Sequence, residues 1–198
     1  MHHFRRICVY CGSSLGHNND FQRAAKRVGQ VLASNKITLV YGGGNVGLMK
    51  EVADGVLEEG GKVIGVIPRK LMELELAHPG LQELYVTDSM HQRKYLMAQL
   101  ADAFIALPGG WGTLEELAEI TTWAQLNYHH KAIGLLNLHG YYDSLLAWIN
   151  HANEQGFIAD PHVKLMAIHD TPEKLIENMK SLQFPDLAET LNIPKRVD

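Results

Sequence analysis

The chain alternates between short apolar runs and longer segments in which apolar residues recur at helical spacing. The short runs are rich in β-branched residues, and the longer segments carry apolar side chains three and four positions apart, so we expect strands and amphipathic helices in turn. The predicted strands are residues 7–11, 37–43, 62–68, 83–87, 102–110, 131–137 and 164–169. The predicted helices are residues 20–34, 46–60, 89–101, 113–126, 142–156 and 171–182.

This alternation predicts the fold class. Strands that are apolar along almost their whole length bury both faces, which is typical of a parallel sheet covered by helices on both sides. We therefore expect an α/β fold with a doubly wound, Rossmann-like parallel sheet. Residues 1–183 form a single predicted domain, and residues 184–198 form a loosely attached C-terminal tail.

Length and charge restrict the partners. The 198 residues, of which 46% are hydrophobic, suffice for one domain with a sizeable core. The net charge is -4 and no cluster of Lys and Arg forms a basic stripe, so we expect no nucleic acid and no membrane as partner. We find no stretch apolar enough for a signal peptide or a membrane span, which predicts a cytoplasmic protein.

Two cysteines form a C-x-x-C pattern, Cys8 and Cys11, inside the first predicted strand. Residues three apart on a strand point to opposite faces, whereas redox pairs sit where a helix begins. The sequence has no second cysteine pair, and the adjacent His129 and His130 cannot face one ion from a regular helix. We therefore expect two buried thiols and no metal site.

Three segments, residues 11–14, 41–49 and 107–116, each follow a predicted strand and contain glycine. Ligands of open parallel sheets bind beyond the carboxyl ends of the strands, so these segments should meet on one rim. The second segment holds G-x-G-x-x-G at Gly42, Gly44 and Gly47, but the next strand lacks the acidic residue of a dinucleotide site and no G-K-[S/T] follows. Its glycines serve either close strand-to-helix packing or phosphate contact.

The P-G-G-W-G-T sequence of residues 108–113 is more specific. Glycines let the backbone approach a ligand closely, and Thr113 places a hydroxyl near a helix N-terminus, where N–H groups favour a phosphate. Thr113 and Glu116 also match a capping box, in which Glu116 serves only as part of the cap.

The helical position of Glu116 favours a second role. Glu116 falls in line with Ile120 and Trp123 on an apolar stripe, whereas Glu115 and Glu119 take the polar side. A carboxylate directed into partly apolar surroundings at the ligand rim is typical of a group that takes part in chemistry.

Arg93 and Lys94 supply positive charge near the start of the predicted helix 89–101. Basic residues in a first turn oppose the helix dipole, so local stability gives a weak reason for them. Binding of an anionic ligand would explain the pair, and the alternative is a solvated surface pair.

With these residues assembled, the chain resembles the LOG ("lonely guy") family of cytokinin riboside 5'-monophosphate phosphoribohydrolases, formerly often labelled lysine decarboxylases. The most specific motifs are M-H-x-R-K at residues 90–94 and P-G-G-x-G-T-x-x-E at residues 108–116. The resemblance extends over nearly the whole chain through RICVYCGSS, YGGGNVGLM, VIGVIP, DAFIALPGGWGTLEEL, TWAQL, GLLNLHGYYDSLL and EQGFI.

The resemblance implies hydrolysis of the N-glycosidic bond of a nucleoside 5'-monophosphate, AMP or N6-modified AMP, to free base and ribose 5-phosphate. It also implies no metal or organic cofactor, and dimers or larger oligomers with sites near the subunit interface. Arg93 and Glu116 correspond to the family's catalytic arginine and glutamate. The corresponding substrate-contact positions are Glu75, Lys94, Gly109, Gly110, Trp111, Gly112, Thr113, Glu115 and Thr122.

Two details qualify this assignment. Leu74 stands where a basic residue is expected before Glu75. Thr122 lies about 120° around the helix from Glu116 and almost two turns later, so one small ligand would contact both only across a homodimer interface. The apolar side chains of Trp123, Leu126 and Tyr128 would then form that interface or, alternatively, part of the intrachain core.

Other functions remain open at this point. The label of a decarboxylase fails, because an enzyme that uses pyridoxal phosphate needs a Schiff-base lysine and a partner for the pyridine nitrogen, and nothing in the sequence marks either. A general purine monophosphate nucleosidase acting on AMP and a non-catalytic nucleotide or cofactor carrier are the alternatives. A carrier has little use for a carboxylate beside a bound phosphate, so Arg93 together with Glu116 favours an enzyme.

Overall fold

The computed structural model describes residues 2–74 and 77–184. The strands are β1 (Arg6–Tyr10), β2 (Thr38–Tyr41), β3 (Val63–Pro68), β4 (Glu83–Thr87), β5 (Ala103–Ala106), β6 (Ala132–Leu136) and β7 (Met166–His169). The helices are α1 (Asn19–Ser34), α2 (Gly47–Glu58), α3 (Arg69–Glu73), α4 (Met90–Leu100), α5 (Trp111–Gln125), α6 (Asp143–Glu154), α7 (Asp160–Val163) and α8 (Pro172–Ser181), with a 3-10 turn η1 (Leu138–Gly140). None of these described helices has the length and apolar character of a membrane span.

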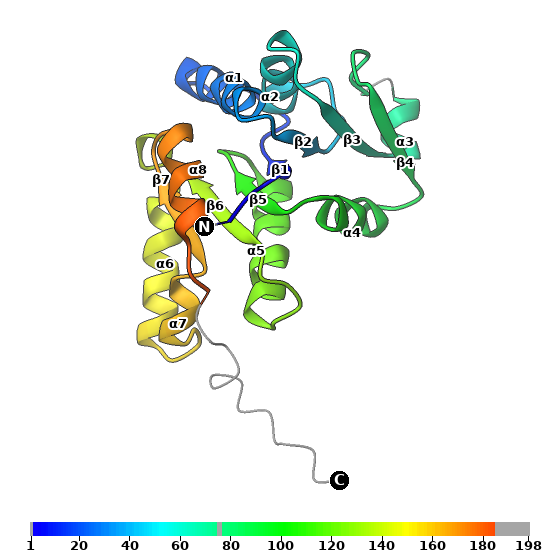
Figure 1. The fold of residues 1–198 in the computed structure, drawn as a ribbon. Coiled ribbons are helices and arrows are strands. Elements are labelled where there is room, and N and C mark those ends of the chain that lie inside the picture. The colour runs from blue at the N-terminus through cyan, green and yellow to red at the C-terminus, as the bar shows by residue number, and fades with distance from the viewer. Residues whose placement is uncertain (1, 75–76, 185–198) are drawn as a thin grey trace.

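The seven strands form one parallel sheet in the order β4-β3-β2-β1-β5-β6-β7 (Figure 1). At its centre Val9 of β1 lies beside Tyr41 of β2 and Ile105 of β5. The chain builds the sheet outward from β1 to β4, then crosses back and extends the other edge from β5 to β7. The topological switch point therefore lies between β1 and β5, where loops diverge and open-sheet proteins place their ligands.

Helices cover both faces of this sheet. Val52 of α2 and Leu175 of α8 belong to the core on one face, together with residues of α1. Met97 of α4 and Ile120 of α5 belong to the core on the other face, where α6 also packs. The predicted doubly wound, Rossmann-like parallel sheet is confirmed, as are all seven predicted strands and six predicted helices.

The sequence pattern missed α3, α7 and η1, because elements of three to five residues are too short to show a helical period. Helix α3 therefore lies between the predicted strands 62–68 and 83–87, where the pattern predicted no element. Of the predicted tail, Phe184 packs its ring edge-on against His130, with 5.9 Å between ring centroids, and residues 185–198 lie outside the described residues.

Helices α1 and α2 pack in unusually close contact through glycine. A Cβ at Gly29 of α1 would overlap the carbonyl oxygen of Val52, and a Cβ at Gly55 of α2 would overlap that of Lys26. The two backbones therefore approach each other where a larger residue would hold them apart, which positions the start of α2 beside the loop after β1.

Gly29→Ala tests this contact. Helix propensity alone would stabilise the protein by about 1 kcal/mol, whereas forced separation of two packed helices costs roughly 1–3 kcal/mol. We expect the melting temperature to fall by several degrees in thermal unfolding followed by circular dichroism. A rise in melting temperature would contradict the close approach of α1 and α2.

Candidate active site

A cavity of about 380 Å³ opens at the carboxyl ends of β1, β2 and β5. All three glycine-bearing segments contribute to its wall, as their positions after the strands predicted. Helices α3 and α4 close the remaining side. The lining residues include Cys11, Gly12, Ser13, Gly42, Gly44, Val46, Met49, Ile67, Leu71, Met90, Arg93, Gly110, Trp111, Gly112, Thr113, Glu115 and Glu116.

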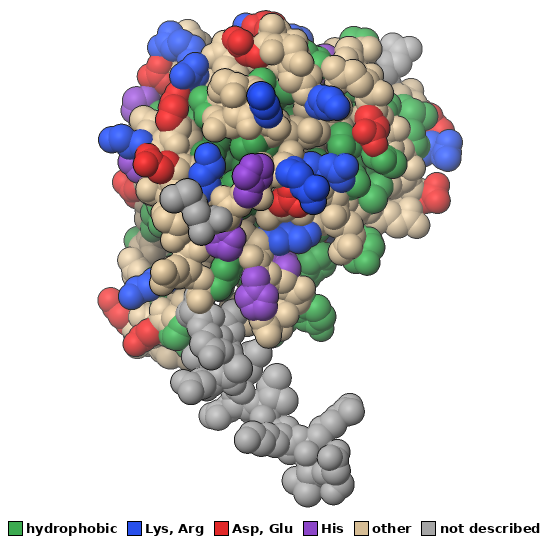
Figure 2. All heavy atoms as spheres, in the orientation of Figure 1, with side chains coloured by type: hydrophobic (Ala, Val, Ile, Leu, Met, Phe, Trp, Pro, Cys, Tyr) green, Lys and Arg blue, Asp and Glu red, His purple; other side chains and the backbone are tan. Residues whose placement is uncertain are grey.

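A larger cavity of about 650 Å³ lies at the opposite, amino end of the strands. Its charged lining residues are Arg5, Arg6, Lys36, Glu59, Lys62 and Asp102. None of the three glycine-bearing segments reaches this cavity, whereas all three line the one at the carboxyl ends of the strands, so we place the site there. On the face drawn in Figure 2, Lys and Arg side chains lie among Asp and Glu side chains.

Packing determines most of the glycine pattern after β2. A Cβ at Gly42 would overlap the guanidinium of Arg93, and a Cβ at Gly47 would overlap the backbone of Ser13. Gly43 and Gly47 also adopt positive φ, 71° and 54°, which glycine tolerates best. Close packing is therefore the reason for Gly42 and Gly47, while Gly44 and Gly42 also line the cavity.

Helix α5 begins earlier than the sequence pattern indicates. Gly110 is the residue that caps α5, Trp111 is its first residue, and no side chain completes the cap. Thr113 therefore lies inside the first turn, and its side chain fills the space that Gly109 leaves by having no Cβ. The predicted capping box of Thr113 and Glu116 is wrong, because the helix already starts at Trp111. Glu116 therefore does not serve as part of a helix cap.

Arg93 of α4 is buried against the carboxyl ends of two strands. Its Nε donates to the carbonyl oxygen of Val66 at 3.1 Å, and its Nη2 donates to that of Gly42 at 3.0 Å. Its Nη1 also donates to Sδ of Met90 at 3.8 Å, so three of the five guanidinium N–H groups have partners and two can serve the cavity. The solvated surface pair considered for Arg93 and Lys94 is wrong, since both side chains are buried.

Lys94 joins two helices instead of facing the cavity. Its Nζ forms an ion pair with Glu119 at 3.1 Å and a second, shorter ion pair with Glu115, both from α5. These contacts with a second helix explain why a lysine lies near the start of α4, where the helix dipole alone disfavours a positive charge. Its positive charge neutralises much of the acidic face of α5 and leaves Glu116 as the carboxylate that lines the cavity without a paired cation.

Burial raises the pKa of Glu116 to about 7, and the positive charge of Arg93 offsets part of that rise. The carboxylate makes no hydrogen bond or ion pair with the described part of the chain. Ile120 is buried on the same stripe, as its helical position predicted. A carboxyl group that titrates near neutral pH and has no structural partner is typical of a catalytic residue.

The structure brings together most of the predicted site residues, but not all. Arg93 and Glu116 share the cavity with Gly110, Trp111, Gly112, Thr113 and Glu115. Gly109 lines a neighbouring hollow of about 300 Å³, Lys94 lies behind the wall, and Thr122 is exposed further along α5. Leu74 is exposed, and Glu75 lies outside the described residues.

Sequence reasoning missed the apolar wall of the cavity. Met49, Ile67, Leu71 and Met90 come from four different elements. Nothing in their local sequence distinguishes them from core residues, because only the tertiary fold brings them to the rim.

Cys8 and Cys11 are buried free thiols on opposite faces of the sheet, as predicted. Burial raises the pKa of both thiols well above the usual range. Among the described residues, no group of three or more His, Cys, Asp or Glu side chains is arranged to hold a metal ion.

The fold and the cavity define a doubly wound α/β protein with a cavity at its switch point. The sequence profile of a family described as "Possible lysine decarboxylase" matches residues 49–179. The chain belongs to this family, the LOG family.

Two relatives of the chain from Arabidopsis thaliana are named cytokinin riboside 5'-monophosphate phosphoribohydrolases. One is 50% identical over 177 residues, which cover 89% of this chain and 82% of the relative. The other is 47% identical over 180 residues, which cover 91% of this chain and 83% of the relative.

Solved structures with the same fold include carriers. The molybdenum cofactor binding protein of Rippkaea orientalis superposes with a TM-score of 0.68 at 26% identity, covering 91% of this chain and 98% of that chain. The Moco carrier protein of Chlamydomonas reinhardtii superposes with a TM-score of 0.67 at 20% identity, covering the same shares, and shows the fold alone.

The raised pKa of Glu116 predicts how stability depends on pH. The folded-state pKa of about 7 exceeds the ordinary 4.5, so the folded protein binds more protons between these values and its stability falls as pH rises through them. At about 1.4 kcal/mol per pKa unit, ionised Glu116 costs up to roughly 3 kcal/mol above pH 7.

We therefore expect Glu116→Gln to raise the melting temperature at pH 8 and to change it far less at pH 5. Glu177→Gln, at an exposed position on α8, is the matched control and should behave alike at both pH values. A shift of equal size at pH 5 and pH 8 for Glu116→Gln would disprove the predicted titration.

Proposed function

We propose that the protein hydrolyses the N-glycosidic bond of cytokinin riboside 5'-monophosphates, or of related nucleoside 5'-monophosphates, to free base and ribose 5-phosphate. The observation that carries this proposal is the convergence of Glu116 and Arg93 on the cavity beside the N-terminus of α5. Relatives about 50% identical over most of the chain bear the corresponding name.

The start of α5 supplies the phosphate site. Leu114 donates its N–H to the carbonyl of Gly110, so the N–H groups before it have no partner within the helix. Gly110, Trp111 and Gly112 are partly or fully exposed, and a Cβ at Gly110 or Gly112 would meet open space. Unpaired N–H groups and the positive end of the helix dipole favour the 5'-phosphate here.

The two charged side chains suit the reaction. Cleavage of an N-glycosidic bond develops positive charge on the ribose and negative charge on the departing base. Ionised Glu116 would stabilise the cationic sugar, and it would either orient the attacking water or bond transiently to the anomeric carbon. Arg93 does not give up a proton, so we assign it hydrogen bonds to the phosphate, the ribose or the departing base.

Two other functions compare less well with the site. The carriers named among the solved structures share the fold, but a bound phosphate gains nothing from a nearby carboxylate such as Glu116, which repels it.

The site also does not fit the chemistry of a decarboxylase that uses pyridoxal phosphate. Among the described residues no lysine lines the cavity, and Lys94 is paired with two carboxylates. A general AMP nucleosidase differs only in the choice of base.

Incubation of the purified protein with AMP and with isopentenyladenosine 5'-monophosphate tests the proposal, with free base and ribose 5-phosphate as the readout. We expect release from the modified nucleotide, and a loss of roughly a hundred- to a thousand-fold for Glu116→Gln and for Arg93→Ala. Glu154→Gln, an exposed substitution on α6, is the control. Release of base from AMP alone would contradict the choice of a cytokinin nucleotide as substrate. No release from either nucleotide would contradict the proposed hydrolase activity.

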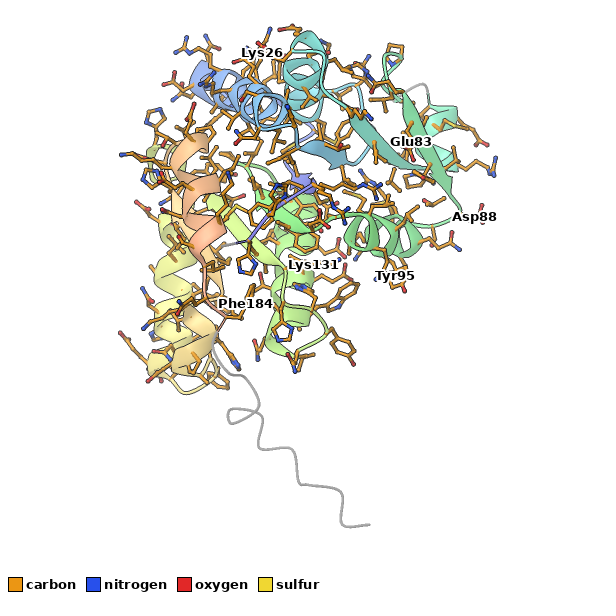
Figure 3. The ribbon with its side chains drawn as sticks, viewed as in Figure 1. Lys26, Glu83, Asp88, Tyr95, Lys131 and Phe184 are labelled. Atoms are coloured by element: carbon orange, nitrogen blue, oxygen red, sulfur yellow. The ribbon has the colours of Figure 1, made fainter. Side chains whose placement is uncertain are left out.

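We also propose a homodimer, in the cytoplasm, without nucleic acid or membrane as partner. Tyr95, Trp123 and Tyr128 line one exposed hollow of about 590 Å³ between α4 and α5, and Leu126 is exposed near it. Figure 3 shows Tyr95 projecting from α4 away from the sheet. Leu126 and Tyr128 are 44% and 77% exposed, so the intrachain core considered for them is wrong, whereas Trp123 packs against the core. A second copy would cover Leu126 and Tyr128 and reach Thr122.

Tyr128→Asp should dissociate this dimer, because a carboxylate would be buried in an apolar interface. We expect a monomer in equilibrium sedimentation and a large loss of base release, with the melting behaviour of the monomer fold retained. Phe157→Asp, which is 84% exposed after α6, is the matched control and should remain dimeric. A fully active monomer would exclude a shared site.

A further inference from the structure

The three carbonyl groups that directly follow β5, those of residues 107–109, accept hydrogen bonds from residues distant in the sequence. The carbonyl oxygen of Leu107 accepts from the hydroxyl of Tyr142 at 2.6 Å, and that of Pro108 accepts from the N–H of Gly12 at 3.1 Å. The carbonyl oxygen of Gly109 accepts from the hydroxyl of Tyr141 at 2.6 Å. Two of the three donors are thus phenols from the segment after β6.

The bond to Gly109 determines the direction of a neighbouring N–H group. The described residues contain no cis peptide, and in a planar trans peptide the N–H points opposite to the C=O. Holding the Gly109 carbonyl towards Tyr141 therefore directs the Gly110 N–H away from Tyr141. A peptide between two glycines can rotate at little steric cost, so without this bond the direction would be weakly determined.

Tyr141 itself is held in place although it is 43% exposed. Its ring packs edge-on against Phe21 and Tyr142, with 5.6 Å and 4.9 Å between ring centroids. The turn that carries both tyrosines is fixed by Asn137, whose side-chain oxygen accepts from the N–H of Tyr142 at 2.7 Å. The hydroxyl therefore reaches Gly109 from a preorganised position.

We propose that Tyr141 is a positioning residue that fixes the Gly109–Gly110 peptide so that the Gly110 N–H faces the phosphate of the ligand. The proposal rests on the proposed function in placing a phosphate at the start of α5. Tyr141 acts through the backbone and does not touch the reacting atoms. It should therefore affect phosphate affinity more than the chemical step.

Tyr142 is a natural control for this proposal. Its hydroxyl holds the Leu107 carbonyl, and the nitrogen of that peptide belongs to Pro108, which has no N–H to present. Loss of the Tyr142 hydroxyl leaves a buried carbonyl without its donor and should cost stability, yet it should redirect no phosphate donor.

The experiment compares Tyr141→Phe and Tyr142→Phe with the wild type by titration calorimetry with ribose 5-phosphate, and by steady-state kinetics with the nucleoside 5'-monophosphate. We expect Tyr141→Phe to weaken ribose 5-phosphate binding and to raise KM about fivefold to tenfold, with kcat and melting temperature nearly unchanged. Tyr142→Phe should lower the melting temperature and leave ribose 5-phosphate affinity unchanged.

Unaltered affinity in Tyr141→Phe, an equal loss of affinity in both variants, or no ribose 5-phosphate binding by the wild type would each overturn the proposal. The binding readout does not depend on catalysis. A wild type that binds ribose 5-phosphate in a manner dependent on Tyr141 but releases no base would refute the hydrolase and uphold the role of Tyr141.

Discussion

The buried guanidinium of Arg93 is the interaction on which the rest of the site depends. It ties α4 to the ends of β3 and β2 through the carbonyl oxygens of Val66 and Gly42, and this is possible only because residue 42 has no side chain. A buried charge is costly unless it is hydrogen-bonded and compensated. The two carbonyl oxygens accept hydrogen bonds from the guanidinium, and the resulting position places Arg93 on the same cavity as Glu116.

The acidic side of α5 is divided between structure and chemistry. Lys94 holds Glu115 and Glu119 in ion pairs, whereas Glu116, which lines the cavity beside Glu115, has no such partner among the described residues. Burial favours its protonated form and Arg93 favours its ionised form, and burial is the larger effect. Glu116 therefore titrates closer to neutral pH than an exposed glutamate does.

Proteins with this fold include carriers of a cofactor as well as members of a hydrolase family. A parallel sheet with glycine-bearing loops at its switch point suits binding as well as catalysis, so the fold does not separate the two functions. The two functions differ in what they need chemically, because binding needs donors for an anion whereas glycosidic cleavage also needs a group that stabilises positive charge.

The sequence by itself determined the seven strands and the parallel doubly wound sheet, because these follow from local periodicity. It also determined that three loops meet on one rim, because parallel strands in such a sheet place their carboxyl ends on the same edge. It also indicated Glu116 through its place on an apolar stripe. Only the tertiary structure decided that α5 starts at Trp111, that Lys94 pairs with α5, and that Tyr141 holds the glycine loop. These depend on contacts between segments distant along the chain, and no local pattern of residues encodes such contacts.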